Sequence, residues 1–599
     1  MKITQLIWGI SFFILLSCNT QKEKTYPDAD AVYLNLTKTF VLNKDGSIVN
    51  SVEKKQKLFT YRAFQSLYGE TRIIYNPEFQ KLVVNESYTT NSGNQIIKTP
   101  DNGFNEVLPP FCQDSKAYSQ LREMVVSHTG LERNAIINCS YKVTTSAGKI
   151  PFLMGIEDLQ ADCPIENLTI VVKVPPKMKL HYKLLNITSE PAIDQGTDFD
   201  TYTWNFQDLP QWRKEIRSAF VCEDLPTLLF TTQKNKSEGV NCVSKPVSSS
   251  SLIDPAIKKY VDSAIKEKKN LQEKALKIQE IVVNELKTLH IPLPLVAFQA
   301  RAEGEVWQSN SGTVLEKAFL LSSLLRSEGL NAEVCLNIPE GLAEEQLPFL
   351  LAAEPIVKLT DLNGEIMLFT ADRLNAGNSD LGIVPFKIIP LNTVHPIFPA
   401  GKPNGIIHIE GKFIIGGDSK LQGEIAGQFS NSFNPYFEIT RNQGKCPQFL
   451  SDFTGSVRKL TTEQASISFT VENKDQLIKH GDFRFLDLKE SKTGISSFHL
   501  IPMPFKRTSA LYLGTSIDES YHYTIILPAN WQLVNPVNIE LLKPGIGHVC
   551  ISLKQSGRVV EVIRKIGIFN PVIATKDYSD FRELMDKWST QKFRQLIIK

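Results

Sequence analysis

The chain has 599 residues, which is too long for a single hydrophobic core, so three or four domains are expected. Its hydrophobic content of 42% and charged content of 22% are typical of globular domains. The formal net charge of +2 and the lack of a long basic run argue against a nucleic-acid-binding protein.

Residues 1–18 have the features of a signal peptide that ends in a lipidation site. Lys2 is followed by an apolar stretch at 6–16, which is shorter than the about 20 residues that cross a bilayer. The stretch runs into the sequence Leu-Leu-Ser before Cys18, which resembles a lipobox. We expect a lipid on Cys18 to anchor the chain in the membrane, with residues 19–30 as a polar tether. The alternative is an ordinary secretory signal with a chance cysteine.

Residues 31–242 have the pattern of a large antiparallel β-sandwich. Apolar and polar residues alternate in short runs, and Asp45-Gly46 separates two such runs as a hairpin turn would. Residues 168–174 form a continuous apolar-rich run, which is typical of a buried strand. The composition of 243–251, VSKPVSSSS, predicts a linker.

Residues 252–396 are expected to form an α+β domain, because helical patterns precede short strand-like runs. The predicted helices lie at 255–289 and 315–326, and the predicted strands lie at 332–336, 356–359 and 366–369. Asn363-Gly364 supplies the turn between the last two strands. A second linker is expected at 395–405.

Alternating apolar and polar residues then return, and 404–599 are predicted to form a second β domain. The fold class is therefore multidomain and mainly β, with a central α+β domain. None of the nine cysteines has the spacing of a metal site, so we expect no metal and no cofactor. Cys222 and Cys242 are a candidate disulfide, and the other thiols after Cys18 are expected to be buried.

One segment of the middle domain resembles an enzyme family. Residues 307–336 read WQSNSGTVLEKAFLLSSLLRSEGLNAEVCL. In the papain-like transglutaminase core of bacteria, a Gly-Asp-Cys-x-Asp-Lys-Ala-like segment opens a helix that ends at a glycine before a strand. Gly312 and Gly329 match the two glycines, and Glu316 replaces the family's acid. The matches along the helix are Lys317, Ala318, Leu320, Leu321, Leu324, Leu325 and Arg326.

Val314 occupies the position of the family's catalytic cysteine. A thiolate at a helix N-terminus is stabilised by the helix dipole and by free N–H groups, which lowers the pKa of the cysteine. Valine has no lone pair and no proton to exchange, so it cannot form the thioester of this mechanism. The resemblance therefore implies a fold that has lost its nucleophile.

The other two catalytic positions lie on the strands that follow. Where the family has a histidine at the start of the first strand, this chain has Glu354 or Pro355, and the sequence leaves both open. Asp372 fits the family's orienting aspartate, although an aspartate after a strand also fits a turn or cap. Trp307 and Gly312 are candidates for lining the remaining cleft, and a packed tryptophan is the alternative.

The resemblance extends over nearly the whole chain. The N-terminal region resembles a β domain of unknown function that precedes such cores in Gram-negative envelope lipoproteins, in segments such as 75–84, 105–109 and 129–132. The stretch 523–569 resembles the β domain that closes these proteins. The implied order is a β-sandwich, a transglutaminase-like core and a second β domain.

No other segment supplies a complete catalytic site. Cys335 is expected on a strand with its side chain packed. His548 and Cys550 have same-face spacing on a strand, but no third metal ligand is near them in sequence. Residues 417–419 (Gly-Asp-Ser) resemble a hydrolase fragment and fit a hairpin turn better.

We therefore expect a cell-envelope lipoprotein without enzymatic activity, anchored to the outer membrane through Cys18 on either its periplasmic or its surface face. Its expected role is the binding of a peptide or glycan, or scaffolding, with no nucleic-acid partner. Two alternatives remain open. One is a cysteine-dependent protease, amidase or transglutaminase with a displaced active site, and the other is a purely structural surface protein.

Overall fold

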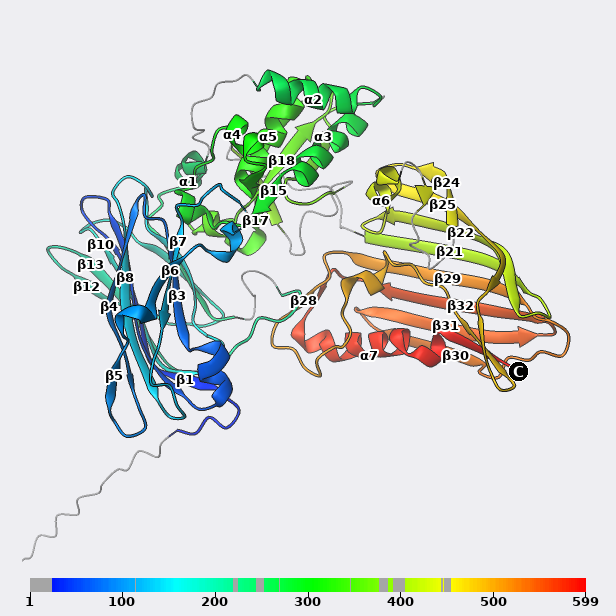
Figure 1. The fold of residues 1–599 in the computed structure, drawn as a ribbon, viewed down its shortest axis with the longest axis horizontal. Helices are drawn as coiled ribbons and strands as arrows, with labels where there is room; N and C mark the ends of the chain where they lie inside the picture. The colour runs from blue at the N-terminus through cyan, green and yellow to red at the C-terminus, as the bar shows by residue number, and fades with distance from the viewer. Residues whose placement is uncertain are drawn as a thin grey trace, which may run out of the picture.

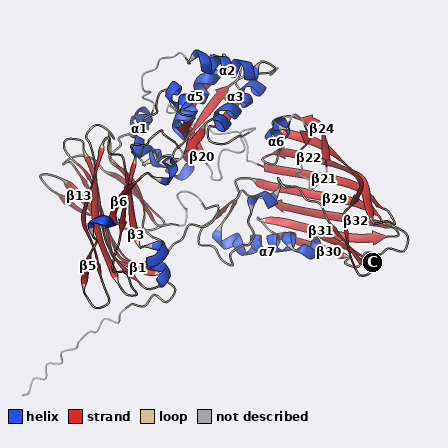
Figure 2. Cartoon of the chain, viewed as in Figure 1, coloured by secondary structure: helices blue, strands red, loops and turns tan. Residues whose placement is uncertain are grey.

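The structure of the protein is a computed structural model that describes residues 24–599 with gaps. The gaps are Asp114, Lys269, Glu345 and the segments 219–224, 244–252, 376–385, 392–403, 443–444 and 447–453. Figure 1 shows three bodies in chain order, the first in blue and cyan, the second in green and the third in yellow to red. Strands dominate the first and third bodies (Figure 2), so the prediction of a multidomain, mainly β fold is confirmed.

The N-terminal body is built on an eight-stranded sheet with the order β12-β13-β10-β1-β2-β8-β4-β5. Its strands are β1 (Ala31–Leu42), β2 (Ile48–Leu58), β4 (Gln80–Thr90), β5 (Ile96–Lys98), β8 (Ile136–Thr145), β10 (Ile165–Val174), β12 (Ala192–Gln195) and β13 (Asp200–Leu209). Gly46, with φ +86°, makes the predicted turn between β1 and β2. The prediction of a purely antiparallel sheet was wrong at its centre, because β1 and β10 pair in parallel. Such a pair needs a long connection, which local turn signals do not report.

Two three-stranded sheets accompany the large one. They are β3 (Glu70–Tyr75), β7 (Arg122–Ser127) and β6 (Phe104–Val107), and β11 (His181–Leu185), β14 (Thr227–Thr231) and β9 (Met154–Asp158). Trp204 and Ile170 of the large sheet share a fully buried apolar core with Leu228 and Phe230 of β14. The sheet β11-β14-β9 is therefore held against the large sheet by burial of apolar surface.

Residues 24–30, predicted as part of a flexible tether, pack against the N-terminal body. The Tyr26 hydroxyl donates a hydrogen bond to Glu166 at 3.1 Å, and its ring stacks on Phe59. Ala29 is buried. The tether prediction was wrong for this segment, because its side chains find partners on the folded domain.

Several predictions fall outside the described residues. They are the signal peptide with Cys18, the first tether residues, Cys222 of the candidate disulfide, and most of both linkers. The second linker ends earlier than predicted, because Asn404 and Gly405 already pair with the neighbouring strand of the C-terminal sheet.

The middle body packs helices on a four-stranded antiparallel sheet with the order β19-β18-β17-β20. Its main elements are α2 (Pro255–Ile265), α3 (Leu271–Glu285), β15 (Lys287–Leu289), α4 (Glu303–Gln308), β16 (Ser311–Thr313), α5 (Val314–Ser327), β17 (Asn331–Pro339), β18 (Glu354–Thr360), β19 (Ile366–Thr370) and β20 (Phe386–Pro390). The predicted second helix and three strands are confirmed as α5, β17, β18 and β19.

The prediction of a single helix over 255–289 was wrong. Asn270 caps a new helix, α3, by accepting a hydrogen bond from the Glu273 N–H at 2.8 Å. After α3 the chain becomes extended and forms β15, which pairs in parallel with β16. This pairing places β16, and therefore the start of α5, beside the end of α3.

The C-terminal body contains a nine-stranded sheet with the order β23-β24-β25-β22-β21-β29-β32-β31-β30. Its strands are β21 (Asn404–Ile415), β22 (Lys420–Asn431), β23 (Lys445–Cys446), β24 (Thr454–Leu460), β25 (Gln464–Asp475), β29 (Ser516–Ile526), β30 (Val537–Lys543), β31 (Gly547–Ser556) and β32 (Val559–Ile568). Residues 417–419 lie in the hairpin between β21 and β22, as predicted. Further strands are β26 (Leu477–His480), β27 (Phe483–Asp487), β28 (Leu511–Tyr512), β33 (Val572–Ile573) and β34 (Gln595–Ile598).

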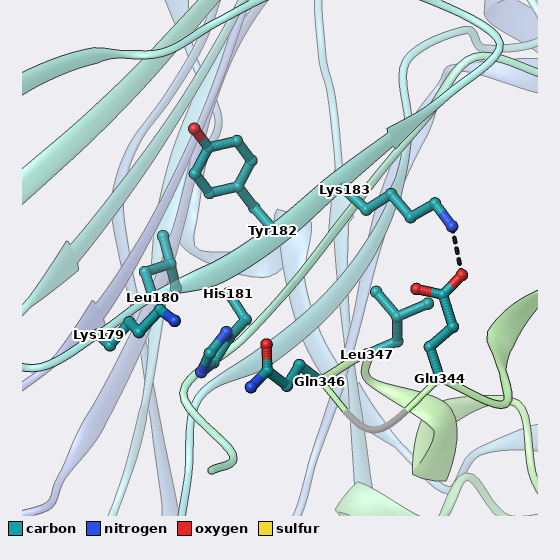
Figure 3. Close-up of a pocket in the computed structure, with 8 residues that line it drawn as sticks. All are labelled: Lys179, Leu180, His181, Tyr182, Lys183, Glu344, Gln346 and Leu347. Carbon is teal, nitrogen blue, oxygen red and sulfur yellow. Dashed lines mark hydrogen bonds and ion pairs between the residues drawn. The ribbon is translucent and has the colours of Figure 1, made fainter. Parts of the chain in front are cut away.

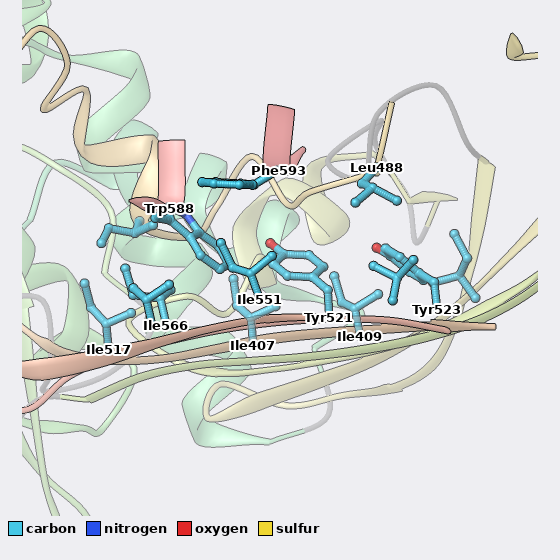
Figure 4. Close-up of a cluster of buried hydrophobic side chains, with 14 of the residues drawn as sticks. Ile407, Ile409, Leu488, Ile517, Tyr521, Tyr523, Ile551, Ile566, Trp588 and Phe593 are labelled. Carbon is cyan, nitrogen blue, oxygen red and sulfur yellow. The ribbon is translucent and has the colours of Figure 1, made fainter. Parts of the chain in front are cut away.

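One face of this sheet is buried under helix α7 (Tyr578–Ser589) and the chain around it. Figure 4 shows Tyr521, Ile551 and Ile566 of the sheet directed toward Trp588 and Phe593. The prediction of an all-β domain missed α7, although the helix buries the apolar stripe typical of a surface helix.

The three bodies also contact one another. The N-terminal and middle bodies share an apolar cluster that includes Phe152 and Leu229 of the former and Phe298 and Leu336 of the latter. Helix α1 (Lys236–Val243) adds buried side chains to this cluster. Helix α6 (Tyr436–Arg441) packs two aromatic side chains against the core that contains α3 and α5.

Candidate functional site at the start of helix α5

Helix α5 begins at Val314, as predicted for the residue in the nucleophile position. Thr313 is the N-cap, and its side chain accepts a hydrogen bond from the Glu316 N–H at 3.2 Å. The Glu316 carboxylate accepts a hydrogen bond from the Thr313 N–H at 2.7 Å, which completes a capping box. Val314 is half-buried at this helix end.

Glu316 lies at the centre of a buried polar network. Its carboxylate accepts hydrogen bonds from Arg301 through the backbone N–H at 3.0 Å, Nε at 2.8 Å and Nη2 at 3.0 Å. The hydroxyl of Tyr118, which belongs to the N-terminal body, donates to the same carboxylate. Ser115 of that body is also hydrogen-bonded to Ser311 at 2.6 Å. The N-terminal body therefore contacts the chain on both sides of Val314.

Lys317 is fully buried one helical turn after Val314. Its ammonium donates to the carbonyl oxygen of Leu286 at 2.8 Å and to the hydroxyl of Thr288 at 2.7 Å. Burial lowers the pKa of Lys317 to about 8, and the nearby carboxylate of Asp372 opposes this shift. Lys317 thus links α5 by hydrogen bonds to Leu286, which follows α3, and to Thr288 of β15.

Glu354 and Asp372, two of the three predicted catalytic positions, are brought together by Arg373. Arg373 Nη1 lies 2.6 Å from Glu354 Oε1 and 3.0 Å from Asp372 Oδ1. Asn337 of β17 donates a weaker hydrogen bond to Glu354 at 3.3 Å. Pro355, the other candidate for the histidine position, is buried on β18 in register with Leu336. Glu354 and Asp372 therefore share Arg373 as an ion-pair partner.

The loop that carries Asp372 and Arg373 is held in place by buried amides. Gln279 of α3 donates hydrogen bonds to the carbonyl oxygen of Thr370 at 2.9 Å and to Asn375 Oδ1 at 2.6 Å. The Asn375 side chain in turn donates to the carbonyl oxygen of Leu368 at 2.6 Å. These buried hydrogen bonds from the amide nitrogens of Gln279 and Asn375 hold the loop in place after β19.

The structure places the two predicted cleft residues in packed surroundings. The Trp307 ring lies 5.6 Å from the Tyr260 ring and is half-buried at the edge of the core. Gly312 is buried, and a Cβ atom there would lie 2.9 Å from Val306 and 3.2 Å from the Glu316 carboxylate. Glycine at 312 therefore allows the capping carboxylate to approach the backbone closely. Cleft lining by these two residues stays a prediction.

The other residues considered for chemistry lie elsewhere. Cys335 is fully buried among Ile356, Leu368 and Ile388, and burial raises the pKa of its thiol. His548 and Cys550 both belong to β31, and the His548 ring lies beside the ring of Phe569. Among the residues that the structure describes, no group of three histidine, cysteine or acidic side chains could hold a metal ion.

Val314 at the start of α5 has no group that could make a nucleophilic attack. The helix N-terminus beside it is closed by the capping box, and the Glu316 carboxylate is engaged by Tyr118 and Arg301. The sequence reasoning missed the network around Glu316, although the Thr-x-x-Glu spacing from Thr313 is the signature of a capping box. Nothing in the sequence pointed to Tyr118, which lies 198 positions from its partner Glu316.

Two stretches of the chain match families of unknown function. Residues 44–213 match DUF3857 and residues 495–598 match DUF3858, each described as a domain of unknown function with a solved structure. None of the curated proteins matches the chain. The two matches flank the middle body, and the first agrees with the predicted N-terminal β domain of unknown function.

Among solved structures, a "putative protease" from Parabacteroides distasonis ATCC 8503 is similar over 95% of this chain and 99% of its own, with 25% identity and a TM-score of 0.73. The overall fold is thus shared with that protein. The periplasmic domain of TgpA from Pseudomonas aeruginosa matches 38% of this chain and 76% of its own at 11% identity, with a TM-score of 0.16 that supports no inference. Within the described residues, no helix is long and apolar enough to cross a membrane.

Proposed function

We propose that this protein is a lipid-anchored cell-envelope protein whose transglutaminase-like middle domain binds a peptide or glycan, or acts as a scaffold, without catalysing a reaction. The observation that carries the proposal is Val314 at the first position of α5, where a catalytic thiol would need the helix N-terminus. The order of α5 followed by the antiparallel strands β17, β18 and β19 supports the comparison with the transglutaminase-like core.

The polar groups around this position support a non-catalytic role. Glu354 stands where the family has its histidine, and it forms an ion pair with Arg373. A carboxylate that is engaged in this way cannot take over the part of a histidine base that is oriented by an aspartate. Asp372, the candidate for the orienting residue, contacts the same arginine at 3.0 Å.

Protease activity is the second candidate, because the Parabacteroides distasonis protein carries that description. A cysteine mechanism would need an accessible thiol with a lowered pKa. Burial instead raises the pKa of Cys112, Cys163 and Cys335, the last to about 12. These thiols have the surroundings of packed core residues.

Turnover assays on the full-length chain test the proposal. We expect no release of peptides from casein and no incorporation of a fluorescent amine into casein, with or without iodoacetamide. Turnover that iodoacetamide abolishes would overturn the proposal. The double variant Val314→Cys with Glu354→His restores the two missing side chains and serves as the matched comparison.

The lipid anchor is tested separately. Cells that express the chain should incorporate labelled palmitate into it, and Cys18→Ser should abolish the label and release the protein from membranes. If the Cys18→Ser variant keeps its palmitate label, the lipid is attached to another residue and the proposed anchor is wrong.

A further inference from the structure

Residues 210–218 form a strap that leaves the N-terminal body after β13 and reaches the C-terminal body. Figure 1 shows this segment crossing toward β28. The N–H of Trp212 still donates to the carbonyl oxygen of Ala161 at 2.6 Å, within the N-terminal body. Further along the strap, Glu215 and Arg217 contact the C-terminal body.

Glu215 makes the first of these contacts. Its carboxylate accepts hydrogen bonds from the N–H of Ser509 at 2.9 Å, from the hydroxyl of Ser509 at 2.6 Å and from the N–H of Thr508 at 3.1 Å. Nε of Arg507 lies 3.6 Å from the same carboxylate. One acidic side chain of the strap therefore engages three consecutive residues of the C-terminal body.

Arg217 makes the second contact. Its Nε and Nη2 donate hydrogen bonds to the carbonyl oxygens of Tyr512 at 2.8 Å and Leu513 at 2.6 Å. Its own carbonyl oxygen accepts a hydrogen bond from the Tyr512 N–H at 2.9 Å. The guanidinium also lies 4.5 Å from the centre of the Phe498 ring. Arg217 therefore binds the backbone of β28 and of the residue that follows it.

The strap docks through its charged side chains, and its apolar side chain stays in water. Ile216, between the two docked residues, is 73% exposed, and Lys214 is also exposed. Hydrogen bonds between protein groups replace hydrogen bonds to water, so each adds little net stability. Contacts between domains allow relative motion unless they bury a large apolar surface. The contact of the strap depends on polar groups instead.

The two junctions of the middle body are of the other kind. The N-terminal and middle bodies share a buried apolar cluster. Figure 3 shows a groove at the edge of this junction, where Leu180 and Leu347 are among the lining residues and Lys183 lies 2.5 Å from Glu344. The aromatic side chains of α6 attach the C-terminal body to the core of the middle body. Because both junctions bury apolar side chains, we expect them to persist when the contact of the strap breaks.

We propose that the strap is a reversible latch, whose release frees the C-terminal body from the N-terminal body while α6 keeps it attached to the middle body. Release costs little, because Arg507 also donates to the carbonyl oxygens of Ser509 at 3.1 Å and Ala510 at 3.4 Å and so keeps partners. Water replaces Arg217 on the backbone of β28. Arg217 has φ +57°, which is unfavourable for a residue with a Cβ atom, so a released strap relaxes.

Hydrogen exchange of the full-length chain, measured by mass spectrometry, tests whether the latch opens in the native protein. The strap accepts hydrogen bonds from the N–H groups of Thr508, Ser509 and Tyr512, so a peptide that covers 507–513 reports on the contact. We expect this peptide to exchange at least about 10-fold faster than peptides from β29 and β32, although Ser509 and Tyr512 are buried. Exchange as slow as in those central strands would overturn the proposal, because the contact would then break only on unfolding.

A matched pair of double variants tests the movement of the C-terminal body. Glu215→Ala with Arg217→Ala should speed exchange of the 507–513 peptide by a further factor of about 10 and increase the radius of gyration in X-ray scattering. Lys214→Ala with Ile216→Ala changes the exposed neighbours and should leave both quantities unchanged.

Three results of the Glu215→Ala, Arg217→Ala variant would overturn the latch. They are unchanged exchange of the peptide, faster exchange with an unchanged radius of gyration, and faster exchange in β29 as well, which would make the strap part of the folded core. None of these measurements depends on turnover, so the proposed function at α5 is tested independently.

Discussion

Two arginine–carboxylate clusters in the middle body differ in how far they are buried. The Glu316 side chain is completely buried and accepts five hydrogen bonds from Tyr118, Arg301 and Thr313. The side chains of Arg373 and Glu354 are 37% and 33% exposed. A buried carboxylate that loses its partners is costly, whereas a surface ion pair contributes little to stability.

The difference separates a structural element from a surface that a ligand can reach. The cluster around Glu316 caps the start of α5 and joins two bodies through Tyr118. The cluster around Arg373 lies nearer the surface, and its ion pairs are partly exposed. The predictions below test this distinction, beginning with the largest expected effect.

Replacing Glu316 with alanine should cause the largest loss of stability. The variant Glu316→Ala leaves the Arg301 guanidinium without its buried counter-charge and removes the capping box of α5. We expect the free energy of unfolding to fall by about 3–5 kcal/mol. Urea denaturation measures the change, with Glu305→Ala, an exposed acid of α4, as the control. A loss no larger than that of the control would contradict a structural role.

Replacing Lys317 with methionine should change the pH dependence of stability. The pKa of Lys317 is lowered to about 8 in the folded protein, and an unfolded lysine has a pKa near 10.4. Between these values the unfolded chain binds more protons, so the contribution of Lys317 to stability increases as pH rises and is lost as pH falls through about 8. Wild type should therefore gain about 2 kcal/mol relative to Lys317→Met from pH 7.5 to 10.

Urea denaturation at a series of pH values measures this difference. Lys259→Met, at an exposed position of α2, is the matched control and should run parallel to wild type over the same range. A Lys317→Met curve that also runs parallel to wild type would mean that the buried ammonium keeps its proton in both states.

Replacing Tyr118 with phenylalanine tests the contact between the bodies. The variant keeps the ring and removes the hydroxyl that donates to Glu316, so we expect a loss of about 1–2 kcal/mol. Tyr260→Phe is the control, because its hydroxyl makes a 3.2 Å hydrogen bond to Glu285 at the surface. Thermal unfolding of both variants distinguishes a buried contact from an exposed one, and equal shifts would contradict the assignment.

Replacing Arg373 with glutamine should have the smallest effect on stability. We expect a loss below about 1 kcal/mol, because the partners are partly exposed, and the loss should diminish as salt is added. Unfolding at low and high ionic strength checks this. A loss above 3 kcal/mol that does not depend on salt would show that the second cluster is as structural as the first.

Much of the local structure could be predicted from the sequence. Leucines at helical spacing after Val314 predicted α5, and Asn363-Gly364 predicted the turn between β18 and β19, where Gly364 has φ +83°. These features depend on residues close together in the chain.

Features that depend on distant residues could not be predicted in this way. The helix expected over 255–289 is two helices and a strand. The break at Asn270 is a local capping signal that the prediction missed, whereas β15 forms because it pairs with β16 further along the chain. Helix α7 was missed inside a region of alternating strands, and its apolar side chains are matched by the sheet that they cover. For β15 and α7, packing between elements overrode the local pattern.

The sequence by itself determined that residue 314 is a valine and that a helix begins beside it, since these follow from residue identity and short-range patterning. Only the tertiary structure decided that Tyr118 of another body donates a hydrogen bond to Glu316 and that Arg373 forms ion pairs with both Glu354 and Asp372. The physical reason is that residues close together in the chain determine local conformation, but they do not determine which distant residues come into contact. Those contacts form when the bodies pack and bury apolar surface.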